Sequence, residues 1–362
     1  MNTQAPGYNR IMIDLPTQRY ALVALAAAAL FGASTPLAKL LQADIAPGLL
    51  AGLLYLGSGA GLALVKLGLR LSRHEPEPPL QARDMPWLAG AVASGGIAAP
   101  LLLMWGLAGA SASGVSLLLN LEGVLTALIA ALVFKEAVAG RIWLAVCLML
   151  AAGLLLGYDP RAGFGLSLRT LAVAAACALW GLDNNLTRRI AAADPVNIAM
   201  IKGLAAGGVN IAAALAYGAS FPSALPLAAA LALGWLSYGI SLVLYIVALR
   251  HLGSARATSH FSTAPFIGAA LAIALLGEPL TAGFAAAFLL MLAATWLLLT
   301  ERHGHAHAHE PLAHEHLHTH DAHHSHAHRG DEGPEPHSHP HEHEPLAHSH
   351  PHLPDLHHRH PH

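Results

Sequence analysis

Ten long apolar segments, separated by short polar stretches, constrain this chain more than any other feature of its sequence. The segments lie near residues 20–41, 46–69, 87–108, 112–134, 141–158, 169–190, 196–217, 226–249, 254–276 and 281–300. A helix that crosses the hydrocarbon core of a bilayer needs about 20 apolar residues. Only 11% of the 362 residues are charged, against about 25% in soluble domains. We therefore predict an all-α membrane protein with ten transmembrane helices.

The rest of the composition narrows the class of protein. The net charge is −2 with neutral histidines, so we expect no nucleic-acid partner. Cys147 and Cys177 lie in apolar segments and form neither zinc-type spacing nor a disulfide framework. No nucleophile constellation or nucleotide-binding loop is visible, so we expect no enzyme and no required cofactor. The first twenty residues lack the short apolar core and cleavage site of a signal peptide, which favours a retained first helix.

The positive charges predict the orientation of the chain. If the N-terminus lies inside, most of the 19 Lys and Arg residues fall on the inner side, and the outer segments hold only Lys39, Arg161 and Arg169. Lys and Arg favour the cytoplasmic side of a membrane. We therefore expect a bacterial inner-membrane protein with both termini in the cytoplasm. This expectation depends on the count of ten, because the loss of one helix would place the tail outside.

The two halves of the apolar region repeat one another. Leu30–Gly32 in the first helix matches Leu179–Gly181 in the sixth, and Lys39 corresponds to Arg188. The acid that follows the fourth helix, Glu136, recurs 142 positions later as Glu278. Each half then holds five helices, and because five is odd, the second half must insert upside down. Inverted repeats with a site at their interface are the design of many secondary transporters.

These elements resemble the drug/metabolite transporter superfamily, and within it the ten-helix exporters built from two EamA domains. The resemblance is carried by Leu30–Ser34 with Lys39, by Leu179–Gly181, by the small-residue turn Gly109–Gly114, and by the helix-end acids Glu136 and Gly277–Pro279. It covers about residues 20–300 and implies alternating access between two bundles and small-molecule export, often coupled to protons. It fixes no substrate.

The resemblance divides the chain into a cytoplasmic segment 1–19, a first EamA repeat 20–158, a second repeat 159–300 and a disordered cytoplasmic tail 301–362. We expect Glu136 and Glu278 to be structural, each serving the start of the helix that follows it.

The fourth segment carries a carboxylate near its middle. Glu122 lies at membrane depth, where a charge costs roughly 2.5–3.5 kcal/mol on insertion scales and usually marks function. Asn120 is two residues earlier, so about 200° separates the two on a regular helix. Glu122 has no acidic counterpart in the second half. We predict a substrate or proton path that includes both residues, and the alternative is a glutamic acid that only ties helices together.

Two further segments add polar candidates to this path. Asp183 and Asn184 stand in the sixth helix, and the alternative is a polar helix end stabilised by i, i+4 pairs with Thr187 and Arg188. His260 stands in the ninth helix and could ligate a metal or move a proton, although a lone helical histidine also suits a core. Pro265 should kink that helix, and broken helices in corresponding halves form transporter sites.

The last 60 residues have a different composition. They hold all but three of the 26 histidines, and a run beginning at Glu310 recurs 34 positions later at Glu344. Imidazole suits zinc, copper, nickel and iron, and His-rich tracts are typical of metal binding. Alternatives are a pH-responsive tail and a metal buffer unconnected to transport. The predicted metal ligands are His303, His305, His307, His309, His314, His316, His318, His320, His337, His339, His341, His343, His348, His350 and His352.

Three functional hypotheses follow from these features. The first is export of a divalent transition metal, nickel or cobalt before zinc, with the tail capturing the ion. The second is export of an amino acid or other small metabolite, with a merely regulatory tail. The third is a metal store whose membrane part is only an anchor, and the duplicated helices argue against it. As partners we expect the lipid bilayer and a small-molecule or metal-ion substrate, with a homodimer as a candidate assembly.

Overall fold

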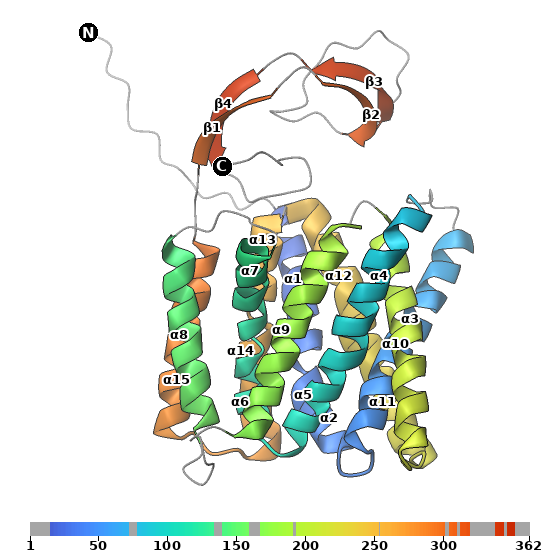
Figure 1. The fold of residues 1–362 in the computed structure, drawn as a ribbon, viewed down its shortest axis with the longest axis vertical. Coiled ribbons are helices and arrows are strands. Elements are labelled where there is room, and N and C mark those ends of the chain that lie inside the picture. The colour runs from blue at the N-terminus through green and yellow to red at the C-terminus, as the bar shows by residue number, and fades with distance from the viewer. Residues whose placement is uncertain are drawn as a thin grey trace. The chain divides into compact units, whose positions relative to one another are not determined.

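A computed structural model describes residues 15–71, 78–133, 140–158, 167–190, 193–252 and 254–300, together with four segments of the tail at 304–309, 312–318, 337–343 and 346–351. The chain divides into two units, Met1–Thr300 and Glu301–His362. The first unit is a helical bundle (Figure 1). The predictions for Glu136 and for three of the predicted metal ligands, His303, His320 and His352, fall outside the described residues.

Every one of the ten apolar segments contains helical structure. In the first half these helices are α1 (Leu15–Gly32), α2 (Ser34–Leu41), α3 (Pro47–Leu71), the 3-10 turn η1 (Ala82–Asp84), α4 (Met85–Ala91), the π-helix η2 (Val92–Ala98), α5 (Ala99–Ala108), α6 (Ala112–Leu118), α7 (Leu121–Leu132) and α8 (Gly140–Gly157). In the second half they are α9 (Leu168–Arg188), α10 (Pro195–Ala216), α11 (Ala224–Gly234), the π-helix η3 (Trp235–Ile240), α12 (Ser241–Leu252), α13 (Ser254–Phe261), α14 (Ala264–Leu276) and α15 (Ala282–Leu299).

Eight of the helical segments are long and apolar enough to cross a membrane. The two others are α8, whose apolar part Arg141–Gly157 is shorter, and α9, which carries the polar run Asp183–Asn185. Both pack within the bundle, α8 against α15 and α9 against α5 and α7 (Figure 1). The count of ten spanning helices therefore stays a prediction.

Two interruptions of the helices recur at corresponding places in the two halves, whereas the break between α1 and α2 has no counterpart in α9. The π-helices η2 and η3 begin at Val92 and Trp235, which are 143 positions apart. The break between α6 and α7 and the break between α13 and α14 are separated by the same 143 positions. The second break directly precedes Pro265, which lies in the first turn of α14, so the predicted kink is confirmed. A shared pattern of irregularities supports the interpretation of an internal repeat.

Glycines let α3 and α10 approach until their backbones touch. A Cβ atom built on Gly59 would lie 2.5 Å from the backbone nitrogen of Leu204, and one on Gly203 would lie 2.8 Å from Cα of Gly59. Small residues that bring backbones together are typical of helix pairs in membranes, where packing rather than the hydrophobic effect drives association. The α3–α10 contact therefore depends on the absence of side chains at these positions.

The α5–α6 turn gathers charged residues from both halves of the chain. Lys39 donates to the carbonyl oxygens of Leu107 at 2.6 Å and Ala110 at 3.0 Å, while the two carboxylate oxygens of Glu278 accept from the amides of Ala112 and Ser113 at 2.6 and 2.8 Å. The prediction that Glu278 serves the helix after it is wrong. Thr281 caps α15 instead, and Glu278 reaches α6, whose unpaired amides attract an anion.

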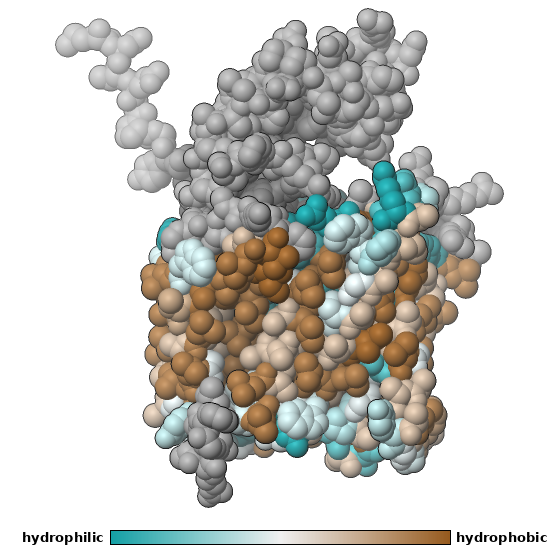
Figure 2. All heavy atoms as spheres, in the orientation of Figure 1, coloured by the Kyte–Doolittle hydropathy of each residue, from teal (hydrophilic) through white to brown (hydrophobic). Residues whose placement is uncertain are grey.

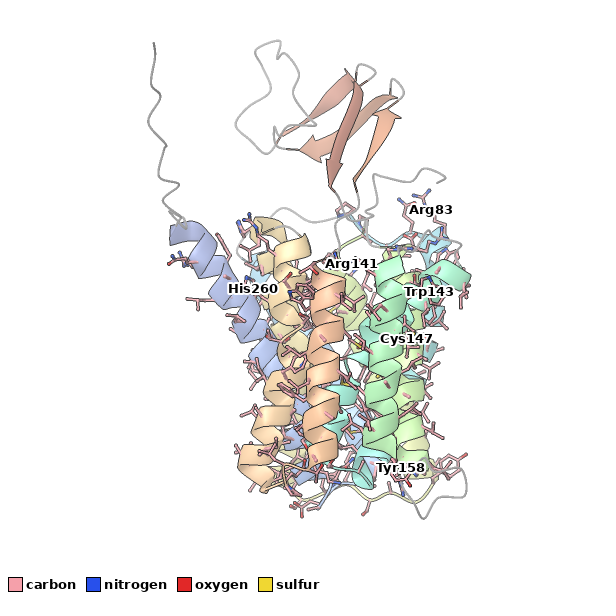
Figure 3. All side chains as sticks on the ribbon, turned by 90° about the vertical axis from the view of Figure 1, so that its left-hand side faces the viewer. Arg83, Arg141, Trp143, Cys147, Tyr158 and His260 are labelled. Atoms are coloured by element: carbon pink, nitrogen blue, oxygen red, sulfur yellow. The ribbon has the colours of Figure 1, made fainter. Side chains whose placement is uncertain are left out.

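The surface of the bundle fits a lipid environment. Brown apolar residues cover the middle of the face in Figure 2, and teal polar residues lie along its edges. Many large apolar side chains of the bundle are exposed, among them Leu132 at 71% and Leu289 at 63%. Arg83 and Arg141 lie at one end of the bundle and Tyr158 at the other (Figure 3). Apolar helices with polar residues at both ends are typical of a multi-pass membrane protein.

The described segments of the tail are extended, and the disorder of the tail stays a prediction. Strand β1 (Gly304–His309) pairs antiparallel with β4 (Leu346–Pro351), and β2 (Leu312–His318) pairs with β3 (His337–His343). The register sets His307 opposite His348 and His316 opposite His339. Alternation of histidine with another residue has the period of two that a strand requires, a signal that the composition of the tail concealed.

We expect Gly203→Val to destabilise the bundle by about 1–3 kcal/mol or more, because the added side chain would meet the backbone of α3. The thermal unfolding temperature of the purified protein in detergent measures this effect. Gly208→Val is the matched control, because Gly208 also lies on α10 and a Cβ there would meet no atom within 4 Å. Equal unfolding temperatures for the two variants would contradict the close α3–α10 contact.

Candidate polar site in the helical bundle

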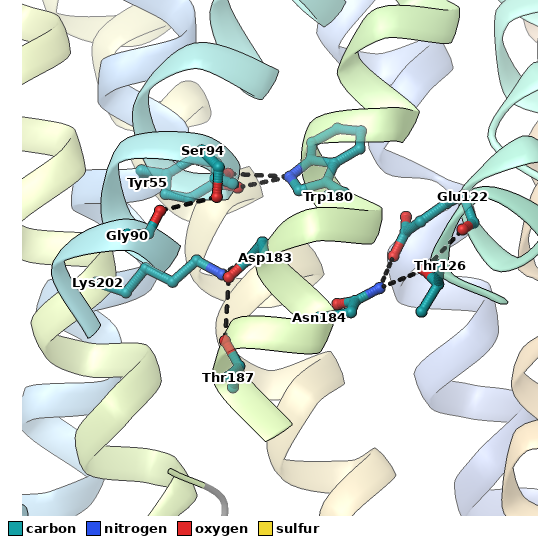
Figure 4. Close-up of polar contacts among 11 residues, drawn as sticks. Tyr55, Gly90, Ser94, Glu122, Thr126, Trp180, Asp183, Asn184, Thr187 and Lys202 are labelled. Carbon is teal, nitrogen blue, oxygen red and sulfur yellow. Dashed lines mark hydrogen bonds and ion pairs between the residues drawn. The ribbon is translucent and has the colours of Figure 1, made fainter. Parts of the chain in front are cut away.

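Helix α9 presents three consecutive polar side chains to its neighbours. Asp183 pairs with Lys202 of α10, Asn184 donates to Glu122 of α7, and Asn185 donates to the carbonyl oxygen of Thr126 at 3.0 Å. Successive helical residues are turned by about 100°, so one helix reaches two different partners. Figure 4 shows Asp183 and Asn184 leaving α9 on opposite sides. The polar run is thus distributed over the bundle interior.

Asp183 and Lys202 form a buried ion pair. The Asp183 side chain is 4% exposed and that of Lys202 is 19% exposed. The hydroxyl of Thr187 donates to the other carboxylate oxygen at 3.0 Å, which is the i, i+4 pair expected from the sequence. Gly95 of η2 makes the space, because a Cβ there would lie 2.0 Å from Oδ2 of Asp183. The negative charge of Asp183 is therefore balanced within the protein.

Glu122 has a different environment. It lies half-buried in the first turn of α7, and its Oε1 accepts from Nδ2 of Asn184 at 2.9 Å. The same amide group also donates to the hydroxyl of Thr126 at 3.2 Å, and this hydroxyl donates to the backbone oxygen of Glu122 at 2.7 Å (Figure 4). Among the described residues no cation forms an ion pair with Glu122. Its partners are neutral, and Asn184 is solvent-exposed.

The π-helix η2 ties several helices to the polar site. The carbonyl oxygen of Gly95 accepts from the Tyr55 hydroxyl at 2.7 Å and from the Trp180 indole at 2.9 Å. The next carbonyl, of Gly96, accepts from Asn210 at 3.2 Å. A π-helix shifts the backbone pairing of a helix and is frequent at functional sites. Side chains of α3, α9 and α10 therefore converge on two adjacent carbonyl groups.

The two broken helices part at the level of Glu122. Their halves α6 and α14 pack against each other, whereas α7 packs on α8 and α9, and α13 packs on α1 and α12. The break at Leu119–Asn120 thus separates α6, which packs on α14, from α7, which diverges from α13. Glu122, two residues beyond the break, lies where the two helices diverge.

Aromatic side chains border the same region. Tyr238 of η3 lies 5.9 Å from the ring of Tyr55 and 5.7 Å from that of Phe31, and Phe31 lies 5.5 Å from Phe261 (centroid distances). All four rings are half-buried. Rings of this kind supply most of the contact area in small-molecule sites, with a few polar groups that fix orientation.

Asn120, one of the predicted path residues, does not join this site. Asn120 is 8% exposed, and its side chain donates to the carbonyl of Leu117 at 2.9 Å, so it stabilises the break between α6 and α7. His260 lies at the level of Trp143, toward the end of the bundle with Arg141 (Figure 3). Its backbone oxygen accepts from the hydroxyl of Thr263 at 2.7 Å.

Comparison with known proteins places the chain in a family. The two halves each match the EamA-like transporter family, over residues 18–158 and 168–300. The chain belongs to the EamA-like transporter family. It is 26% identical over 286 residues to an uncharacterized transporter of Methanothermobacter thermautotrophicus (strain Delta H), covering 74% of this chain and 82% of that protein. A crystal structure with 19% identity and a TM-score of 0.56, covering 77% of this chain and 95% of the other, shares the fold.

Membership in this family confirms the resemblance drawn from the sequence, including its two repeats, and it indicates transport rather than catalysis. Sequence reasoning missed two partners in the site. Lys202 stands out as a basic residue within an apolar segment, a signal that could have been paired with Asp183. Thr126 lies one helical turn after Glu122, and that spacing was equally visible.

We expect Lys202→Met to destabilise the protein by roughly 3–5 kcal/mol, because it leaves the carboxylate of Asp183 buried without a counter-charge. Adding Asp183→Asn to this variant should recover most of the loss. Thermal unfolding of the two single variants and the double variant measures the coupling. Additive losses in the double variant would show that Asp183 and Lys202 do not interact.

Proposed function

We propose that the protein is a secondary transporter that moves a small organic solute, such as an amino acid or related metabolite, by alternating access between its two repeats. The observation that carries this proposal is Glu122, a half-buried carboxylate at the point where two broken helices diverge, whose hydrogen-bond partners among the described residues are neutral. A carboxylate that can accept further hydrogen bonds, with aromatic rings beside it, suits a small organic ligand. A proton on Glu122 is a suitable coupling ion, because a carboxylate can exchange a proton for cargo.

Several features support an inverted arrangement of the repeats. Each repeat has five helical segments, and the interruptions recur after 143 positions. A repeat with an odd number of spans must reverse its orientation on duplication, which gives a pseudo-two-fold axis in the membrane plane. The basic residues favour placing both termini in the cytoplasm of a bacterium, with the tail on the inner side of the plasma membrane.

Glu122→Gln should reduce the initial rate of transport by about tenfold or more, because the variant cannot carry a negative charge or release a proton. The assay is uptake of the twenty labelled amino acids, one at a time, into proteoliposomes containing the full chain. Asp44→Asn is the matched control, since Asp44 is an exposed carboxylate in the turn between α2 and α3. Full activity of Glu122→Gln would sink the proposal, and uptake of no amino acid would count against this cargo class.

Export of a divalent metal is the second candidate function. It is favoured by the histidine-rich tail and by the register that sets histidines opposite one another on paired strands. Histidine is a residue type that suits zinc or nickel. Within the described part of the chain, no group of three or more His, Cys, Asp and Glu residues could hold a metal ion. The bundle therefore supports the organic solute better, and the tail would act as a metal-binding or regulatory segment.

Deletion of residues 303–362 separates these two functions. Under metal export we expect cells that express the full chain to accumulate less nickel or cobalt, and the deletion to abolish most of that effect. Metal content of cells exposed to nickel, cobalt, zinc and copper in turn is the measurement. If the full chain changes the content of none of them, metal export is ruled out, whereas amino-acid uptake by the deletion variant would leave the first proposal standing.

A further inference from the structure

We propose that Lys39, Arg169 and Glu278 form a gate on the α5–α6 turn, and that this gate must open for cargo to pass at that end of the bundle. We call these three residues the end latch. The inference goes beyond the proposed function, because it names the residues that close one side and the side that is closed in this structure.

The end latch joins the two repeats through one short turn. Lys39 comes from the first repeat, and Arg169 and Glu278 come from the second. Arg169 donates to the carbonyl oxygen of Trp105 at 2.6 Å, and its guanidinium lies 3.9 Å from the centre of the Trp105 ring. Gly109 admits the arginine, because a Cβ there would lie 2.7 Å from Nε of Arg169. Loss of the latch would free the turn from the second repeat.

The charges of the latch match the helix ends that they contact. Lys39 binds the last carbonyl groups of α5, and Glu278 binds the first amide groups of α6. Helix ends leave these groups unpaired and carry partial charges of the corresponding sign. Lys39 also lies within electrostatic reach of Glu278, which attracts it, and of Arg169, which repels it. The turn is therefore held by an attractive Lys39–Glu278 pair across the two repeats, and Arg169 is held by its own contacts with Trp105.

The position of the latch makes it reversible. Arg169 lies in the first turn of α9, and its amide donates to the hydroxyl of Ser167, the residue that caps this helix. The amide of Ser167 donates to the carbonyl oxygen of Gly157. Tyr158, which follows Gly157 in the chain, is 68% exposed. Water at this end can replace the hydrogen bonds of an opened latch, which makes their net contribution modest. A buried pair such as Asp183–Lys202 has no such replacement. The latch is thus suited to open and close, whereas the buried pair is suited to hold α9 on α10.

The packing of the broken helices agrees with a closed latch end. The halves α6 and α14, which lie toward the latch, pack on each other, and α7 and α13 beyond the breaks pack on different helices. At the end away from the latch, Lys66 and Asp194 form an ion pair at 3.1 Å between α3 and the start of α10. That pair does not connect α7 with α13. The two broken helices are therefore joined at the latch end, and they diverge toward the opposite end.

Cysteine accessibility in membrane vesicles tests the latch without any knowledge of the cargo. The background carries Cys147→Ser and Cys177→Ala, and the reporter is Ser116→Cys, on a residue of α6 that is 1% exposed. Tyr158→Cys and Arg83→Cys identify which side of the vesicle faces each end of the bundle. Glu278→Gln and Lys39→Met should raise the rate at which a membrane-impermeant maleimide labels the reporter from the Tyr158 side by about tenfold, the factor for one lost charge-assisted hydrogen bond.

Lys66→Met is the matched control, because it removes a paired lysine at the opposite end, and it should leave the rate within about twofold. A second reporter, Thr126→Cys, should label more slowly from the Arg83 side when the latch is weakened, as the closed-latch state loses population. The proposal is overturned if both latch variants leave Ser116→Cys unchanged, or if Lys66→Met raises its labelling equally. Faster labelling of both reporters from both sides would indicate unfolding and would also overturn it. None of these outcomes depends on whether Glu122 binds an organic solute.

Discussion

Polar groups inside an apolar bundle must find partners within the protein, and α9 shows how strongly this requirement shapes the fold. The helix carries Asp183, Asn184 and Asn185 in succession, and it falls outside the segments apolar enough to span a membrane by composition. An unsatisfied backbone or side-chain group costs several kcal/mol in hydrocarbon. Each of the three side chains has a partner on another helix. The position of α9 between α7 and α10 is therefore fixed by hydrogen bonds as much as by packing.

The two repeats share a backbone pattern but differ in the chemistry placed on it. Both have a π-helix in the same position and a broken helix after it. In the first repeat, η2 receives hydrogen bonds from Tyr55 and Trp180, and the first turn after the break carries Glu122. In the second repeat, the first turn after the break carries Pro265. Duplication thus explains the scaffold, and divergence of one half explains the site.

Much of the fold follows from the sequence, because hydropathy over about 20 residues reports directly on membrane insertion. The ten apolar segments, the small-residue turn at Gly109–Gly114 and the break at Pro265 were all readable in this way. The π-helices were not, since Ser94 and Ser237 lie in ordinary apolar runs and the shift in backbone pairing depends on tertiary contacts.

The candidate site was only partly readable for a related reason. The sequence identifies residues whose charge is costly to bury, such as Glu122 and Asp183. It does not tell which of them forms an ion pair with a basic residue. Lys202 lies 19 positions from Asp183, too far for a local pairing rule, and only the packing of α9 and α10 against η2 brings them together. Asn120 and Glu122 are neighbours along the chain, yet the helix break gives one a structural bond to Leu117 and leaves the other at the site.

The separation of these two kinds of charge has a mechanical consequence. Charges whose partners lie deep in the bundle, as in Asp183–Lys202, are costly to break and hold helices of one repeat together. Charges at the ends, as in Lys39 and Glu278, exchange protein partners for water at little net cost. A transporter needs rigid bodies that move and contacts between them that open. The distribution of ion pairs along the bundle provides both, with Glu122 between them as the acidic group that no cation in the described part of the chain neutralises by direct contact.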